Sequence, residues 1–307
     1  MSFRILDISN PGYYLSVRRG FLLVSKEREE VLRLDMDELG ALILQGPGLT
    51  LSQNIIAELA ERGIAITVCN NKHQPVAWFW PAVGNYIQTK RINGQIAMKE
   101  PQKKQLWRQI VRCKIAFQKR HLEAHGQDIK RFDELIKEVQ SGDKTNREAM
   151  AAKLYWQALF KEGFQRGDEQ NGINSLLNYG YAIIRAAMAR AVMGAGLHPA
   201  IALFHHNSED TMPLVDDLME PFRPLVDLAV FALNLKSITI NNPESKKLLA
   251  AVTEWDLPAQ NGATPLYQAM QQLAISLGKI CAGEGNTLAL PKPPPVDEWR
   301  EVFMETT

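Results

Sequence analysis

The sequence predicts an α+β fold of two domains: an N-terminal β-sandwich-like domain with one small helix, and a C-terminal all-α domain. The chain has 307 residues, enough for about two domains with a hydrophobic core in each. Short apolar or alternating runs occupy the first part of the chain, and helical periodicity occupies the rest. The pattern changes at Pro81–Gly84, so we expect domains at residues 1–84 and 85–307.

The N-terminal domain is expected to be built of short strands. Turn residues at Asn10-Pro-Gly12 and Arg18-Arg-Gly20 separate the first runs. Ser52–Arg62 is predicted as the small helix, with Ser52 as its cap and Gly63 after its last turn. The expected strands are Phe3–Ile8, Tyr13–Val17, Phe21–Val24, Val31–Leu34, Ala41–Leu44, Ile64–Val68 and Val76–Trp80. This pattern favours a structural or dimerising meander over a catalytic unit.

Helical periodicity predicts the C-terminal domain. The helix expected at Ser175–Met193 is alanine-rich and almost uncharged, which predicts that it is buried on most sides as the spine of the domain. The other expected helices are Gln102–Glu123, Asp128–Gln140, one beginning near Thr145, Pro224–Leu235 and Pro265–Cys281. The run Pro291-Lys-Pro-Pro-Pro295 predicts an extended, mobile tail.

The composition indicates an ordinary globular protein of a reducing compartment. Hydrophobic residues make up 46% and charged residues 22% of the chain, and the net charge is only +1. Three widely spaced cysteines suggest neither a disulfide framework nor a thiolate zinc site. The N-terminus is charged where a signal peptide needs an apolar run, and we therefore expect a cytoplasmic protein with no membrane span.

One stretch is strongly basic despite the neutral total. Between Lys90 and Arg120, ten Lys and Arg residues face the single acid Glu100, a local charge of +9. Rows of Lys and Arg on a helix can neutralise phosphates, which dominates non-specific affinity for nucleic acids. A solvated face balanced by acids elsewhere is the alternative. The candidate nucleic-acid contacts are Lys103, Lys104, Arg108 and Arg112.

Histidines and acids gather in the segment that follows the spine helix. His205 and His206 end an apolar run, and Asp216, Asp217 and Glu220 fall on neighbouring faces of a predicted helix. Three close carboxylates repel one another unless a cation neutralises them. Imidazole and carboxylate ligands without thiolates suit Mg²⁺ or Mn²⁺. The alternative is that the two aspartates favour the helix dipole and that His205 is a satisfied core residue.

A further carboxylate stands at the start of another helix. Thr145 and Glu148 have the spacing of a capping box, in which the glutamate reaches back to the helix start. However, Ala149, Ala151 and Ala152 leave room around the carboxylate for a ligand or another segment, and Tyr155 lies two turns further on. The residues alone leave both interpretations open.

Three segments together resemble one known family. They are Glu148 with its Ala-x-Ala-Ala-x-x-Tyr-Trp continuation, the Gly-Leu-x-Pro segment that ends at His205, and Leu214-Val-Asp-Asp-Leu-Met-Glu220-Pro-Phe-Arg-Pro. The combination resembles the larger protein of the CRISPR spacer-acquisition pair, an integrase also described as a DNA endonuclease. The sequence of the last segment is most similar to the version of this protein that accompanies type II systems. The N-terminal strands are also similar, so the resemblance covers nearly the whole chain.

The resemblance implies a catalytic metal site. Glu148, His205 and Glu220 match the family's metal ligands, with Mg²⁺ or Mn²⁺ as the expected cofactor, and the distance from the proline favours His205 over His206. Asp217 matches an acid that holds the histidine or a metal-bound water in place. Tyr155 is expected beside the site. Arg223 is expected to steady Glu220 or to contact DNA, with a structural role at the helix end as the alternative.

The resemblance also implies a function and partners. The expected reaction inserts short spacer DNA at the repeat of a CRISPR array, by attack of a 3′-hydroxyl on a phosphodiester, and serves antiviral defence. The expected partners are double-stranded DNA, a second copy of the chain, a small protein that bridges two such homodimers, and other type II CRISPR proteins. The alternatives are a catalytically silent DNA-binding scaffold and a structure-specific nuclease acting by hydrolysis.

Overall fold

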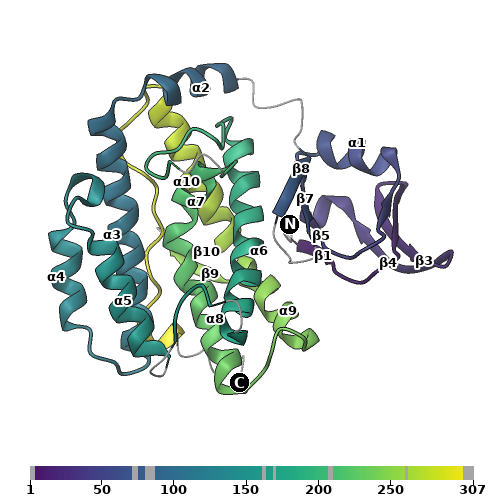
Figure 1. The fold of residues 1–307 in the computed structure, drawn as a ribbon. Helices are drawn as coiled ribbons and strands as arrows, with labels where there is room; N and C mark the ends of the chain where they lie inside the picture. Colours follow the sequence, from purple (N-terminus) through teal and green to yellow (C-terminus); the bar gives the residue numbers. More distant parts are fainter. Residues whose placement is uncertain are drawn as a thin grey trace.

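A strand-rich region and a helical region lie side by side, which confirms the α+β prediction (Figure 1). The computed structural model describes residues 4–70, 75–79, 87–160, 164–168, 171–206, 210–259 and 262–299. The boundary expected at Pro81–Gly84 lies outside these residues, so the division at residue 84 stays a prediction. Within the described ranges, no helix is long and apolar enough to cross a membrane.

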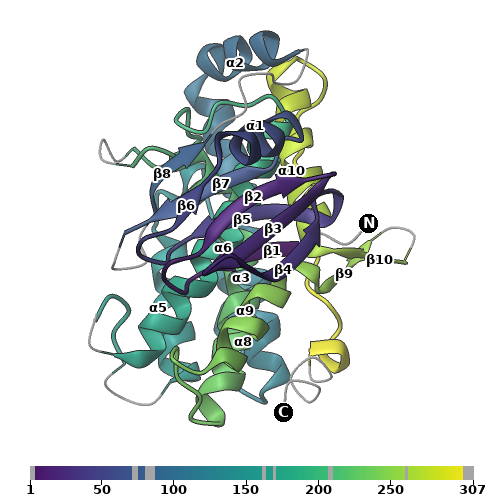
Figure 2. The same ribbon diagram turned by 90° about the vertical axis from the view of Figure 1, so that its right-hand side faces the viewer.

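The strand-rich region contains two four-stranded sheets packed face to face (Figure 2). The first has the order β1-β5-β7-β8, and its strands are β1 (Arg4–Ile8), β5 (Leu39–Leu44), β7 (Ala65–Cys69) and β8 (Pro75–Phe79). The second has the order β4-β3-β2-β6, and its strands are β4 (Glu29–Asp35), β3 (Phe21–Lys26), β2 (Tyr14–Arg18) and β6 (Thr50–Leu51). The expected meander is wrong in several of its pairings, because β5 pairs in parallel with both β1 and β7, and β2 pairs in parallel with β6.

Strand β5 shows why the two regions adhere. All six of its residues are buried, as expected for a central parallel strand covered on both faces. Leu42 and Leu44 point into the core between the sheets, whereas Ala41 and Ile43 point into the core of the helical region. The hydroxyl of Tyr179 also donates a hydrogen bond of 2.6 Å to Asp7, across the junction.

Helix α6 (Gly172–Gly194) is the predicted spine of the helical region, with most of its residues buried. Gly180 lets it approach α8 (Arg223–Leu235) closely, since a Cβ there would lie 2.4 Å from a side-chain carbon of Val226. The other helices are α1 (Gln53–Glu61), α2 (Gln88–Ala97), α3 (Glu100–Ala124), α4 (Lys130–Glu138), α5 (Arg147–Leu159), α7 (Pro213–Met219), α8 (Arg223–Leu235), α9 (Pro243–Ala251) and α10 (Leu266–Cys281). The sequence does not predict α2, α9 or the hairpin of β9 (Asp256–Ala259) and β10 (Gly262–Pro265), which interrupts the otherwise helical region.

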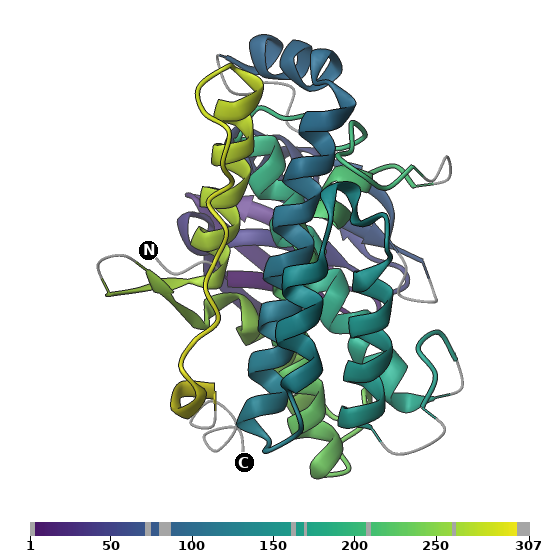
Figure 3. The same ribbon diagram turned by 90° about the vertical axis from the view of Figure 1, so that its left-hand side faces the viewer.

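The C-terminal segment is extended, as predicted, but the expectation of mobility is wrong for its described part. It runs alongside α3 and α10 (Figure 3). The backbone N–H of Leu288 donates to Gln109 of α3 at 3.1 Å, and that of Ala289 donates to Ser276 of α10 at 2.9 Å. Trp299 is almost fully buried. The helices therefore hold the segment at several points.

Candidate active site

Glu148 is held at the first turn of α5, but the capping-box interpretation is wrong. The carboxylate of Asp143 accepts the backbone N–H groups of Arg147 and Glu148, each at 2.9 Å. These N–H groups need a partner because the first turn of a helix has none of its own. Since Asp143 does the capping, the side chain of Glu148 is available for other contacts.

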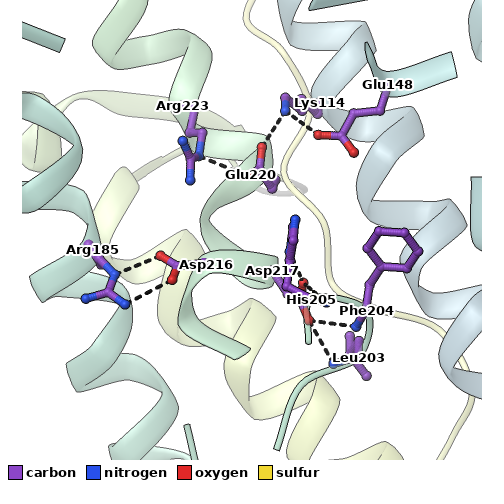
Figure 4. Close-up of polar contacts among 10 residues, drawn as sticks. All are labelled: Lys114, Glu148, Arg185, Leu203, Phe204, His205, Asp216, Asp217, Glu220 and Arg223. Carbon is purple, nitrogen blue, oxygen red and sulfur yellow. Dashed lines mark hydrogen bonds and ion pairs between the residues drawn. The ribbon is translucent and has the colours of Figure 1, made fainter. Parts of the chain in front are cut away.

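Lys114 of α3 joins Glu148 to Glu220 (Figure 4). Its Nζ lies 2.6 Å from Oε1 of Glu148 and 2.5 Å from Oε2 of Glu220. Glu220 begins the short 3-10 turn η3 (Glu220–Phe222) between α7 and α8, and its other oxygen lies 3.0 Å from Nε of Arg223. The structure thus brings together two carboxylates far apart in the sequence, with a lysine between them.

The ion pairs outweigh burial in this cluster. Burial alone would raise the pKa of Glu220, but the charges of Arg223 and Lys114 hold this pKa below its ordinary value. Burial would likewise lower the pKa of Lys114, and the charges of Glu220 and Glu148 hold it above the ordinary value instead. Both side chains are therefore charged at neutral pH.

His205 is positioned by Asp217, which is fully buried. The carboxylate of Asp217 accepts the backbone N–H groups of Leu203 at 2.7 Å and Phe204 at 2.9 Å, and it contacts Nδ1 of His205 at 2.6 Å. An ionised acid at Nδ1 favours the tautomer that carries its proton there, which makes Nε2 the nitrogen that can bind a metal. Figure 4 shows the outer edge of the ring pointing toward Glu220.

The charges of both glutamates of the cluster also act on His205. The hydrogen bond to Asp217 is the main reason why the pKa of His205 is raised, and the charges of Glu220 and Glu148 act in the same direction. Glu148, His205 and Glu220 therefore share one electrostatic environment, although their elements are separated along the chain.

Asp216 is not part of this cluster. It forms a two-point contact with Arg185 of α6, at 2.7 Å to Nε and 2.9 Å to Nη2. Three acids within five positions thus have three different partners: Arg185, the 203–205 turn and Lys114. The expectation that Asp216 lies beside Glu220 to share a cation is wrong, and its role is to tie α7 to α6.

Tyr155 lies in a buried polar network behind the cluster. Its hydroxyl is 2.6 Å from Nδ1 of His121 and also interacts with Asp227, which accepts the hydroxyl of Tyr181 at 2.5 Å. Burial raises the pKa of Asp227 to about 7. Arg223 lies over the ring of Tyr181, 4.8 Å from its centre, and so connects the network to Glu220.

A comparison with protein families identifies the family to which this chain belongs. A family model described as CRISPR associated protein Cas1 matches residues 6–250. The chain belongs to the Cas1 family. A curated relative, the CRISPR-associated endonuclease Cas1 of Neisseria meningitidis serogroup C, is 39% identical over 235 residues, which cover 76% of each protein. The residues that the family model matches include strands of the N-terminal region, helices of the C-terminal region and Glu148, His205 and Glu220.

Solved structures with the same fold include an integrating enzyme. A casposase bound to its integration product has a TM-score of 0.79 at 18% identity, covering 98% of this chain and 99% of that one. A chain of a Cas6-RT-Cas1–Cas2 complex has a TM-score of 0.74 at 16% identity, covering 94% of this chain and 36% of that one. At such identities these likenesses show the Cas1 fold rather than the chemistry.

Lys114 is the residue of this Cas1 site that sequence reasoning missed. It lies in the basic stretch, which predicts contacts with nucleic acid rather than with acids of the protein. A signal was nevertheless available, because Lys114 lies four residues after Ile110 and three before Phe117, both on the apolar stripe of the predicted helix. A lysine on the buried face of a helix requires an acidic partner.

The candidate DNA contacts on α3 have mixed environments. Lys104 is exposed, whereas Arg112 is half-buried. Lys103 forms an ion pair with Glu100 at 3.2 Å, and Nε of Arg108 donates to the carbonyl of Val139 at 2.8 Å. Arg108 therefore has a structural task at the end of α4, and the nucleic-acid role of all four residues stays a prediction.

The donor set of the cluster fits a hard divalent cation. Two carboxylates and an imidazole suit Mg²⁺ or Mn²⁺. Among the described residues, no three His, Cys, Asp or Glu side chains already stand close enough together to hold a metal ion. The ammonium group of Lys114 lies between Glu148 and Glu220.

Proposed function

We propose that this Cas1 family member is a divalent-metal-dependent DNA integrase and endonuclease of CRISPR adaptation, which inserts short spacer DNA at the repeat of a CRISPR array. The observation that carries the proposal is the joining of Glu148 and Glu220 through one buried cationic group, with His205 facing them. The curated endonuclease relative supports the enzymatic role, and the casposase bound to an integration product supports strand transfer as its form.

The reaction exchanges one phosphodiester for another and needs no nucleotide cofactor. The 3′-oxygen of the incoming strand forms a bond to phosphorus, and the bond to the 3′-oxygen of the repeat strand breaks. The protein must align the three atoms and stabilise the charge on the phosphate oxygens. Mg²⁺ or Mn²⁺ held by Glu148, His205 and Glu220 would polarise the phosphate and lower the pKa of the attacking hydroxyl.

The surrounding residues prepare the ligands. Asp217 holds the proton on Nδ1 of His205 and so presents the lone pair of Nε2. Arg223 keeps Glu220 ionised and oriented. Asp143 fixes the first turn of α5 and with it Glu148. Each ligand thus depends on a neighbour that does not itself touch the substrate.

The partners follow from the need to join both ends of an insert. Two active centres at a fixed separation require at least a homodimer. The strand-rich region would contribute to the dimer interface, and a small protein of the Cas2 kind would bridge two dimers. The Cas1–Cas2 neighbour supports this assembly. Duplex DNA would be held by the α3 residues Lys103, Lys104, Arg108 and Arg112 through its phosphates, in the cytoplasm of a prokaryotic cell. Other type II CRISPR proteins are proposed as further partners.

A strand-transfer assay tests the proposal. The purified protein, with and without its small partner, is incubated with a short duplex and a supercoiled plasmid in Mg²⁺ or Mn²⁺. We expect covalent joining of the duplex to the plasmid, and we expect Glu220→Ala to abolish joining while the fold and duplex affinity persist. Cut ends without joined products would indicate a hydrolytic nuclease instead. Duplex binding without any strand chemistry would indicate a scaffold.

A further inference from the structure

We propose that Lys114 is a resident counter-cation that keeps the metal site closed until DNA arrives, and that it thereby couples metal binding to the binding of a DNA phosphate. This inference rests on the proposed function, because it assigns Glu148 and Glu220 as metal ligands. It goes further by naming a residue that decides when those ligands accept the metal.

The contacts place Lys114 in competition with a metal ion. Its ammonium group touches both carboxylates at 2.6 and 2.5 Å, and only 12% of its side chain is exposed. Mg²⁺ holds its oxygen ligands at about 2.0–2.1 Å, closer than the ammonium does. A metal bound to both carboxylates must therefore draw them into the space that Lys114 now fills. The two cations cannot share this position.

The charge balance gives the same result. Glu148 and Glu220 carry two negative charges, and Lys114 and Arg223 carry two positive ones, so the cluster is neutral as it stands. A divalent cation added while Lys114 and Arg223 both remain leaves these four groups with an excess of positive charge in a largely buried place, which is unfavourable without an anion.

Lys114 is the cation that can move. Its ammonium group stands on a flexible four-carbon stem, whereas Arg223 is held over the ring of Tyr181 and against Glu220. A DNA phosphate at the site supplies the missing negative charge and a new partner for the displaced ammonium group. Metal and DNA therefore bind more tightly together than either does alone.

Binding of Mn²⁺, measured by calorimetry with and without a short duplex, tests this coupling. In the wild-type chain we expect the duplex to tighten Mn²⁺ binding about tenfold, a typical coupling between two sites. In Lys114→Met we expect Mn²⁺ to bind about tenfold more tightly without DNA, and the duplex to add little. Lys119→Met is the matched control, since Lys119 lies on the same helix and pairs with the exposed Asp133; its Mn²⁺ binding should equal that of the wild type.

Two further variants keep the test decisive. Lys114→Met removes the charge that joins the partly exposed Glu148 to the buried Glu220, so Lys114→Gln is measured beside it as a polar variant. In both variants the rise in melting temperature on adding Mn²⁺ should exceed the wild-type rise. If Glu220→Ala loses Mn²⁺ binding while the two Lys114 variants bind Mn²⁺ no better than the wild type, the metal site stands and the role of Lys114 is refuted. If the wild type and all variants fail to bind Mn²⁺ and to join DNA, the proposed function and this inference both fall.

Discussion

The environment of each acid in the 216–220 segment decides its role, although the three lie within little more than one helical turn. Asp216 is bound by an arginine of α6, Asp217 by the backbone of the 203–205 turn, and Glu220 by a lysine of α3. Helical periodicity places them on neighbouring faces but says nothing about the segments opposite. Those partners come from distant parts of the chain, so helical periodicity does not identify Lys114.

Asp217→Asn should impair both the fold and the metal site. The amide cannot accept the three backbone N–H groups of residues 203–205 and the histidine contact with a full negative charge, so we expect a loss of about 2–3 kcal/mol in the free energy of unfolding. Mn²⁺ affinity should fall about 10–100-fold, as is typical when the acid that orients a ligating histidine is replaced. Urea unfolding and calorimetry measure the two effects. Asp133→Asn, at an exposed acid, is the control, and equal behaviour of the two variants would contradict the assignment.

Asp227 makes a separate prediction about pH. Burial raises its pKa from 3.8 to about 7, so between these values the folded chain retains a proton that the unfolded chain releases. The free energy of unfolding therefore loses a contribution as pH rises through this window. Asp227→Asn cannot ionise, so its stability relative to the wild type should increase by on the order of 2 kcal/mol between about pH 5 and pH 8. Chemical unfolding at several pH values measures this, and parallel curves for the two proteins would refute it.

At the scale of elements, the start of α5 positions Glu148 through a cap that spacing did not identify. Thr145 and Glu148 match a capping box, but the carboxylate of Asp143 accepts the N–H groups of Arg147 and Glu148 instead. The backbone turns at Asn146, with φ of 52°, and this turn brings the Asp143 carboxylate beneath the helix end. The left-handed residue is the local cause, and a sequence pattern does not reveal it.

Asp143→Ala should therefore weaken α5 and displace Glu148. We expect a loss of about 1 kcal/mol in the free energy of unfolding, as for other lost caps, together with slower strand transfer. Ser52→Ala offers a matched control, because Ser52 precedes α1 at the cap position but its hydroxyl accepts no hydrogen bond from the helix start within the described structure. Its stability should stay within about 0.5 kcal/mol of the wild type. Equal losses at the two positions would contradict this account of α5.

At the scale of the whole molecule, local patterns predicted the elements and long-range contacts arranged them. The fold class, the buried spine α6 and most strands follow from hydrophobic period and turn residues. The parallel pairing of β1 with β5 does not follow from these patterns, because the sequence of β1 does not specify the strand with which it pairs. The same holds for the C-terminal segment, whose proline-rich run predicts extension but not the side chains of α3 and α10 that hold it.

The gathering of the site was predicted by resemblance rather than by spacing. Three separate motifs in the order known from the family indicate Glu148, His205 and Glu220, whereas the residues alone leave a capping role for Glu148 open. The structure removes that alternative and shows the lysine that joins Glu148 to Glu220.

The C-terminal segment should contribute to global stability. Trp299 is almost fully buried, and its ring packs against Phe117 and His121 of α3. Trp299→Ala should cost about 3–5 kcal/mol in the free energy of unfolding, as is usual for a buried aromatic residue. Leu235→Ala, at an exposed position, should be nearly neutral in the same urea titration. A loss at Trp299 no greater than at Leu235 would show that the segment is not part of the core.

Anomalous diffraction from crystals grown with Mn²⁺ tests the central claim most directly. When a short duplex is present in the crystals with Mn²⁺, the account predicts one strong peak in coordinating contact with Glu148, with Nε2 of His205 and with Glu220, and an ammonium group of Lys114 that has withdrawn from between the two glutamates. A peak bound elsewhere, or Mn²⁺-saturated crystals in which Lys114 still joins Glu148 to Glu220, would contradict it.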